Sequence, residues 1–213
     1  MSGTGAARAL WLNSTVKADD KSNPKRRVLF FTKSAGFEHS VIKRPKDPRT
    51  GEEKPSHAEK VLLDLGAKNN FELVHSKDGG IFTSESFSKF DAVFFYTSGD
   101  LLTVGKDGHP AMTREGKETL LSAVRNGMGF LAAHPASDSF HASPADADRY
   151  KNFGEKVDPY IAMLGAEFMH HGAQQKARLV CADPAFPGFA ELKDGVELLE
   201  EWYALKDFAQ DMH

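Results

Sequence analysis

Short apolar runs alternate with amphipathic segments along most of the chain. The apolar, β-prone runs are residues 28–32, 71–74, 91–96 and 129–133. Runs that are almost continuously apolar are typical of strands buried on both faces. A helix is predicted from Ser56, because Glu59 follows at the spacing of a capping box, and a second over 113–125. This alternation predicts an α/β fold, in which helices cover both faces of a parallel sheet.

The last third of the chain shows weaker patterns. A short helix is predicted at 160–164, a strand at 177–181 and one long strand at 196–205. Residues 1–24 are predicted to form a flexible arm that ends at Pro24, because a mildly apolar start is followed directly by polar residues. A chain of 213 residues suits one well-cored domain, so residues 25–213 are predicted to be that domain.

Composition narrows the class of protein. The chain carries 27 basic and 30 acidic residues, a formal net charge of −3, which gives no electrostatic reason to expect a nucleic-acid or membrane partner. No apolar stretch is long enough for a transmembrane helix. The single cysteine, Cys181, excludes an internal disulfide framework and agrees with a cytoplasmic location. The sequence leaves a homo-oligomer open.

Polar side chains follow the ends of the predicted strands. They are His39 after the first strand, Asp100 after the third, and His134, Asp138 and His141 after the fourth. In open α/β sheets, ligands bind beyond the carboxyl ends of the strands, so these residues are candidates for one shared site. Each also has a structural interpretation, since an aspartate can cap a turn and a histidine can be an ordinary surface residue.

His134 has the strongest local argument. It leaves a small-residue strand end, Ala132-Ala133, and is followed by Pro135, which suits a first helical position. This is the arrangement of a nucleophile elbow. Such an elbow carries Ser or Cys in a hydrolase, whereas a histidine there can act as a general acid or base or bind a metal.

A second group of polar residues occurs later in the chain. His170 and His171 are adjacent, so at most one of them is expected to face the site, and the segment Glu200-Glu201-Trp202-Tyr203 follows. In a strand, Glu201 and Tyr203 share one face. A carboxylate beside aromatic rings suits a sugar, although a core tryptophan with solvated glutamates fits the sequence equally well. His134, His141, one of His170/His171 and Glu201 would also make a ligand set for zinc or a similar divalent ion.

Five segments resemble the trehalose-utilisation (ThuA-like) family, which is similar in fold to class I glutamine amidotransferases. They are SAGFEHS at 34–40, YTSGDL at 96–101, GFLAAHPASDSFH at 129–141, MLGAEFMHHGAQQ at 163–175 and EEWYALKDFAQDMH at 200–213. The resemblance implies a flavodoxin-like sheet with His134 at the position of the amidotransferase cysteine. It also implies that glutaminase activity is absent, because an imidazole cannot form the thioester.

The resemblance further implies a role in handling sugars or oxidised 3-keto sugars. The site residues that it carries over are His39, His134, Asp138, His141, His171, Glu201 and Trp202. Asp100 joins them from the strand-end argument, and Tyr203 joins them as an aromatic residue beside Glu201. Relatives of this kind continue past His213, so the chain is expected to be truncated at its C-terminus.

Two functions follow from these observations. The first is an enzyme that acts on a disaccharide or keto-sugar through histidine acid/base chemistry, with His134 at the centre and His39, His141 and Glu201 assisting. The second is a non-catalytic sugar-binding or interaction module, in which Trp202 and Tyr203 would matter more. Cys181 is disfavoured as a nucleophile because it does not lie at an elbow.

Overall fold

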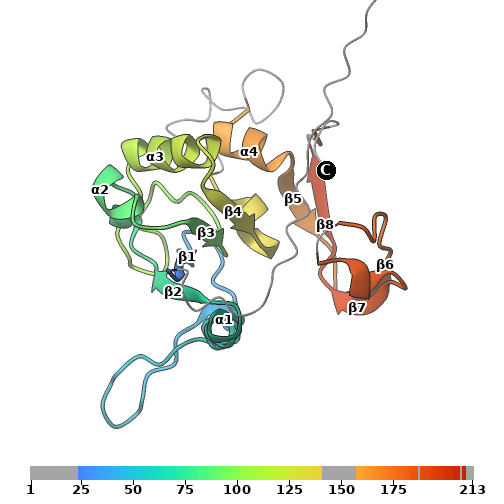
Figure 1. Cartoon of the computed structure of the whole chain (residues 1–213), viewed down its shortest axis with the longest axis horizontal. Coiled ribbons are helices and arrows are strands. Elements are labelled where there is room, and N and C mark those ends of the chain that lie inside the picture. The colour runs from blue at the N-terminus through green and yellow to red at the C-terminus, as the bar shows by residue number, and fades with distance from the viewer. Residues whose placement is uncertain (1–23, 141–156, 187, 207, 210–213) are drawn as a thin grey trace, which may run out of the picture.

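The computed structural model describes residues 24–140, 157–186, 188–206 and 208–209 (Figure 1). The predicted N-terminal arm therefore lies outside the described residues except for Pro24, and the candidate His141 lies outside them as well. Among the helices of the described ranges, none is long and apolar enough to cross a membrane.

A four-stranded parallel sheet forms the centre of the molecule. Its strands are β1 (Arg26–Phe31), β2 (Phe71–Ser76), β3 (Ala92–Phe95) and β4 (Gly129–Ala132), in the spatial order β2-β1-β3-β4. All three pairings are parallel. The last residues of β1, β3 and β4 lie in register, Phe31 beside Phe95 and Phe95 beside Ala132. The predicted parallel α/β sheet is confirmed, and the three segments that leave these strands start at one edge.

Helices cover both faces of the sheet, as Figure 1 shows. Phe31 and Phe95 point to one face, where they join the core with α2 (Ser84–Phe87), α3 (Arg114–Arg125) and α4 (Pro159–Leu164). Phe30 lies on the opposite face, the side of α1 (His57–Lys68), where its ring contacts Phe94 and His75. This alternation follows from the two-residue repeat of a strand.

The helix starts follow the sequence signals. Ser56 and Glu59 form the predicted capping box of α1, with both reciprocal hydrogen bonds present. Thr113 caps α3 through a hydrogen bond from the Gly116 backbone N–H. Asp158 caps α4 by accepting from the Tyr160 N–H at 2.8 Å. These caps satisfy backbone donors that the helices leave unpaired, and they fix where each helix begins.

The C-terminal strands form two antiparallel pairs beside the main sheet. β5 (Glu167–His171) pairs with β8 (Tyr203–Lys206), and β6 (Gln175–Leu179) pairs with β7 (Val196–Glu200). The prediction of one strand over 196–205 was wrong: the chain leaves one partner and joins the other at Glu201-Trp202, which belong to neither strand. β5 has no strong apolar pattern and was not predicted.

Short 3₁₀ turns complete the described structure. They are η1 (Ser40–Ile42), η2 (Gly79–Ile81), η3 (His134–Asp138) and η5 (Ala190–Leu192). The third of them begins at the end of β4 and presents the histidine of the predicted elbow.

Candidate functional site

His134 occupies a strained backbone position at the end of β4. Its φ is +44°, in the left-handed region that non-glycine residues rarely adopt. It begins η3, with Pro135 next in the chain, so the sharp turn predicted from the sequence is present. A non-glycine residue held in this region costs on the order of 1–3 kcal/mol, and such strain concentrates at functional sites.

Tyr203 contacts the His134 ring by a hydrogen bond and by ring packing. The first residue of β8, it places its hydroxyl 3.1 Å from Nε2 of His134, and the two ring centroids are 4.6 Å apart. The protonated phenol can donate to Nε2 of His134, and in that arrangement the proton of the neutral imidazole sits on Nδ1. The pair therefore joins a base to a proton donor within hydrogen-bond distance.

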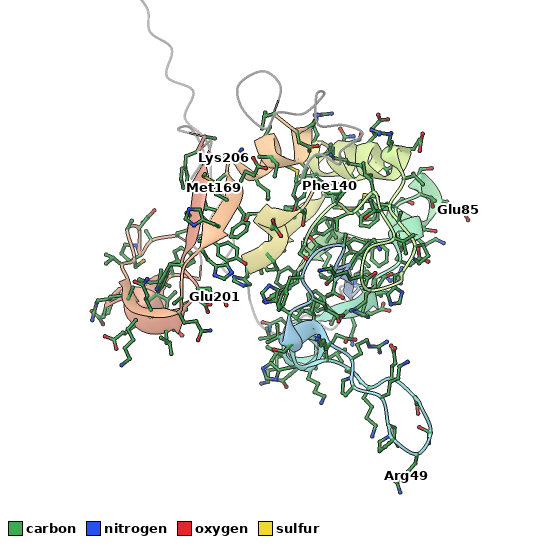
Figure 2. The ribbon with its side chains drawn as sticks, turned by 180° about the vertical axis from the view of Figure 1, so that it is seen from behind. Arg49, Glu85, Phe140, Met169, Glu201 and Lys206 are labelled. Atoms are coloured by element: carbon green, nitrogen blue, oxygen red, sulfur yellow. The ribbon has the colours of Figure 1, made fainter. Side chains whose placement is uncertain are left out.

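Glu201 lies between two histidines. Its Oε2 is 3.9 Å from Nε2 of His134 and 3.9 Å from Nε2 of His171. Figure 2 shows Glu201 between the C-terminal strands and the central sheet. The side chains of His134 and Glu201 are 24% and 29% exposed, so their attraction is only partly screened by water. A positive charge formed on His134 would be stabilised here.

His39 completes the cluster from the loop after β1. Its ring lies edge-on to His134, with centroids 4.6 Å apart, and it also contacts Phe37 and Tyr96 at 4.9 and 5.7 Å. Two imidazoles are thus in contact, one edge-on to the other, at the carboxyl edge of the sheet. The contribution of Tyr96 was missed from the sequence; its position directly after β3 was the available signal.

Burial sets the protonation of this cluster. Burial lowers the pKa of His134, while the charges of Glu200 and Glu201 raise it and so oppose the shift. Burial and the neighbouring His134 lower the pKa of His39. Burial raises the pKa of Tyr96 to about 12 and raises that of Tyr203 as well. At neutral pH, His134 and His39 are therefore neutral bases and the two phenols are protonated.

A family model described as ThuA, trehalose utilisation, matches residues 27–213. The chain belongs to the ThuA family. A search of curated proteins gives no match. Among solved structures, the chain is similar to a putative ThuA-like protein from Bacteroides uniformis ATCC 8492, with a TM-score of 0.60 and 16% sequence identity. The alignment covers 88% of this chain and 64% of that chain, so this chain spans less than two thirds of the protein that it resembles.

Membership of the ThuA family agrees with the fold and connects the chain with carbohydrate metabolism. The predicted family resemblance is thereby confirmed. The likeness to the solved structure shows the fold alone at this level of identity. The relation to glutamine amidotransferases, and with it the absence of glutaminase activity, stays a prediction.

Other predicted site residues take part in local structure. Asp100 Oδ1 accepts from the Leu102 backbone N–H at 3.0 Å, the local turn contact that the alternative interpretation expected. Trp202 donates its Nε1–H to the Gln175 carbonyl at 2.8 Å and so ties the strand crossing to β6. Asp138 ends η3; its charge raises the pKa of Tyr203.

Only some of the predicted metal ligands lie within the described residues. Within the described ranges, no three His, Cys, Asp or Glu side chains are grouped closely enough to hold a metal ion. His134, His171 and Glu201 do converge, but His141 lies outside the described residues. Cys181 lies apart from the cluster, where its thiol approaches the Phe189 carbonyl at 3.9 Å.

Proposed function

We propose that this ThuA-family chain is an enzyme that acts on a keto-sugar or keto-disaccharide by acid/base chemistry centred on His134. The observation that carries the proposal is the pair formed by His134 and Tyr203. The imidazole lies on a strained turn at the carboxyl edge of the sheet, and the protonated phenol of β8 lies 3.1 Å from it. Pairs of titratable groups with opposite protonation states are the usual basis of acid/base assignments.

The two groups suit proton removal from a carbon next to a sugar carbonyl. His134 Nε2 would take the proton and become an imidazolium, while the electron pair moves onto the carbonyl oxygen. Tyr203 would donate a hydrogen bond to that developing oxyanion. The carboxylate of Glu201, 3.9 Å from Nε2, would stabilise the imidazolium. The substrate would have to displace the hydrogen bond that Tyr203 makes to His134 in the free protein.

Pro135 supports this assignment over acyl transfer. In a nucleophile elbow, the backbone N–H of the residue after the nucleophile forms part of the oxyanion hole. Proline has no backbone N–H, so the elbow that begins at His134 lacks that donor. Another donor would have to replace it in stabilising an oxyanion, and the Tyr203 hydroxyl is suitably placed.

The sugar part of the proposal rests on the ThuA family and its description as trehalose utilisation. The polar character of the cluster agrees with it: a carboxylate, a phenol and imidazoles surround His134. A small-molecule sugar is therefore the proposed partner, and a cytoplasmic location fits this role.

The test is turnover of a 3-keto-disaccharide by the wild type and by His134→Ala. Loss of a positioned acid/base group lowers rates by roughly 10²–10⁴-fold, and we expect kcat to fall in that range. A matched control is His57→Ala, which removes an exposed histidine at the start of α1. Equal rates for His134→Ala and the wild type would remove His134 from the mechanism. Sugar binding without turnover by the wild type would instead indicate a binding module.

A further inference from the structure

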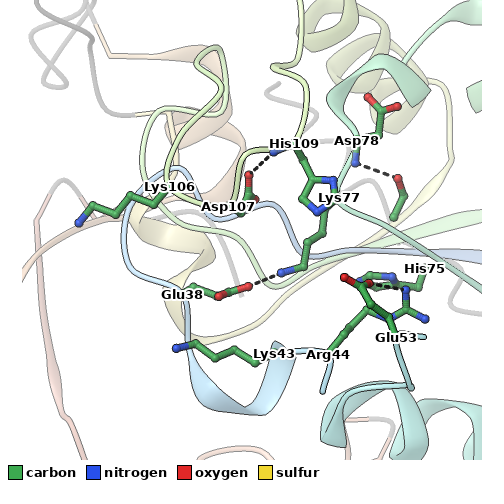
Figure 3. A pocket seen from close by; sticks show the side chains of 11 residues that line it. Glu38, Lys43, Arg44, Glu53, His75, Lys77, Asp78, Lys106, Asp107 and His109 are labelled. Carbon is green, nitrogen blue, oxygen red and sulfur yellow. Dashed lines mark hydrogen bonds and ion pairs between the residues drawn. The ribbon is translucent and has the colours of Figure 1, made fainter. Parts of the chain in front are cut away.

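A polar pocket of about 510 Å³ lies at the carboxyl ends of β1 and β2 (Figure 3). Its walls come from the end of β2, the turn after η1 and the loop that contains Asp107. Drug-sized ligands occupy pockets of roughly 300–1,000 Å³, so the volume is large enough for a small molecule. No residue of the predicted site lines this pocket.

The charges that line the pocket balance. The cationic side chains are Lys43, Arg44, Lys77 and Lys106, and the anionic ones are Glu38, Glu53, Asp78 and Asp107. With four of each sign, the formal sum is zero when the histidines are neutral. The other lining residues are two histidines and a serine. A wall of this composition offers many hydrogen-bond donors and acceptors and no apolar side chain.

Buried contacts hold part of the wall in place. Lys77, with a side chain only 8% exposed, forms an ion pair with Glu38. The Asp107 side chain, 1% exposed, pairs with the buried Lys33 at 3.3 Å and accepts from the Ser34 backbone N–H at 2.6 Å. These partners neutralise both carboxylates. The wall is therefore preorganised, which reduces the ordering cost of binding.

The remaining groups differ in role. His75 is bound to the Thr32 hydroxyl at 2.7 Å, and burial lowers its pKa to about 4, so it adds no charge at neutral pH. Lys43, Lys106 and the His109 ring border the open space, as Figure 3 shows. The two long lysine side chains could adjust to the oxygens of a ligand.

We propose that this pocket is a second binding site for a neutral polyhydroxy molecule, a monosaccharide or similar polyol. Sugar hydroxyls both donate and accept hydrogen bonds, and they match a wall that is rich in both and neutral in sum. An anion or a metal cation would meet charges of both signs, four carboxylates against the four cations of the lining and the buried Lys33. An apolar ligand would leave the polar wall unsatisfied.

The pocket and the His134 cluster lie next to each other and share the segment of Glu38 and His39. Glu38 reaches into the pocket, whereas the next residue, His39, packs against His134. Consecutive Cα atoms are only about 3.8 Å apart, so one short segment forms the wall between the two. The second site does not depend on the proposed chemistry, because no residue of the catalytic proposal lines it.

The experiment is an NMR titration of the ¹⁵N-labelled protein with glucose, inorganic phosphate and Mg²⁺ in separate samples. We expect glucose to shift the amide signals of residues 76–78 and 106–109, and phosphate and Mg²⁺ to leave them in place. The double variant Lys106→Ala/His109→Ala should weaken glucose binding by about tenfold, the effect of losing one or two hydrogen bonds. Lys193→Ala, in an exposed position, is the control and should bind like the wild type.

A second variant, Lys43→Ala, removes a donor that lines the pocket and should also weaken glucose binding. Failure of the catalytic proposal would not affect the result, because the amides that report on this pocket belong to none of the residues of that proposal. The proposal is overturned if glucose does not shift these amides at millimolar concentrations. It is equally overturned if phosphate or Mg²⁺ shifts them more strongly than glucose, or if the double variant binds glucose like the wild type.

Discussion

The buried ion pair between Lys117 and Asp158 joins α3 to the start of α4, and Asp158→Asn tests its importance. The side chains of the two residues are 9% and 2% exposed. The Lys117 ammonium also lies 4.3 Å from the centre of the Phe140 ring, next to the end of η3. The asparagine keeps a carbonyl oxygen that can cap α4, so the change removes mainly the charge.

The expected loss of stability can be bounded from this geometry. Removing one partner of a buried pair costs about 3–5 kcal/mol. Deprotonation of the remaining lysine sets a ceiling, because neutralising a lysine with an unfolded pKa near 10.4 costs about 4.6 kcal/mol at pH 7 and about 1.9 kcal/mol at pH 9. The nearby charge of Asp100 and the Phe140 ring offset part of the loss. We therefore expect about 3–4 kcal/mol at pH 7.

The sign of the pH dependence follows from the same argument. In Asp158→Asn, burial without the aspartate lowers the folded pKa of Lys117 below its unfolded value. The unfolded state then binds more protons between these two pKa values, so the stability of the variant rises with pH relative to the wild type. Desolvation already lowers the pKa of Lys117 in the wild type.

Urea denaturation of both proteins at pH 7 and pH 9 measures these effects. The matched control is Asp64→Asn, which breaks the exposed pair between Lys68 and Asp64, with side chains 67% and 62% exposed. That pair is expected to contribute only about 0.3–0.5 kcal/mol. A loss below about 1 kcal/mol for Asp158→Asn, or a loss that grows from pH 7 to pH 9, would refute the reasoning.

Three further predictions concern the site and its supporting loops. Glu201→Gln removes a charge that raises the pKa of His134, so the imidazole should titrate at a lower pH in an NMR titration; an unchanged titration would contradict this. Tyr203→Phe keeps the ring but loses the hydroxyl, and we expect kcat on a 3-keto-disaccharide to fall about 10²-fold with little change in Tm; an undiminished kcat would exclude the hydroxyl from the chemistry. Gly99→Ala should lose about 2 kcal/mol or more in urea denaturation, because φ is +74° and the new Cβ would lie 2.3 Å from a backbone nitrogen. Gly51→Ala, with φ +73° and open space around the Cβ, should lose only about 1 kcal/mol; equal losses would show that the close approach is unimportant.

The central sheet could be predicted because its strands carry their own signal. Residues 91–96 and 129–133 are almost continuously apolar. A strand that is buried on both faces must be apolar at nearly every position. The turn at His134 could also be predicted, since small residues before it and a proline after it are local features. The C-terminal strands were predicted only in part: the strand expected at 177–181 overlaps β6, β7 and β8 were expected as one strand, and β5 was not expected. β6 is exposed along its whole length, so it lacks the apolar pattern that would define its bounds.

The site was predictable in part for the same reason. The sequence predicted that Glu201 and Tyr203 share one face of a strand. Glu201 instead lies between β7 and β8, although both side chains do lie beside His134. Long-range pairing was not visible in the sequence. The ion pair between Lys77 and Glu38 joins residues 39 positions apart, and no local pattern marks either of them. The second pocket could therefore be found only from the folded structure.

The most direct test of the proposed chemistry is deuterium exchange into a 3-keto-disaccharide in D₂O, followed by ¹H NMR. If His134 removes a proton next to the carbonyl, the wild type should exchange that proton for deuterium. His134→Ala should do so at least about 10²-fold more slowly. Exchange at the same rate in both proteins, or no exchange above the background with the wild type, would contradict the role assigned to His134.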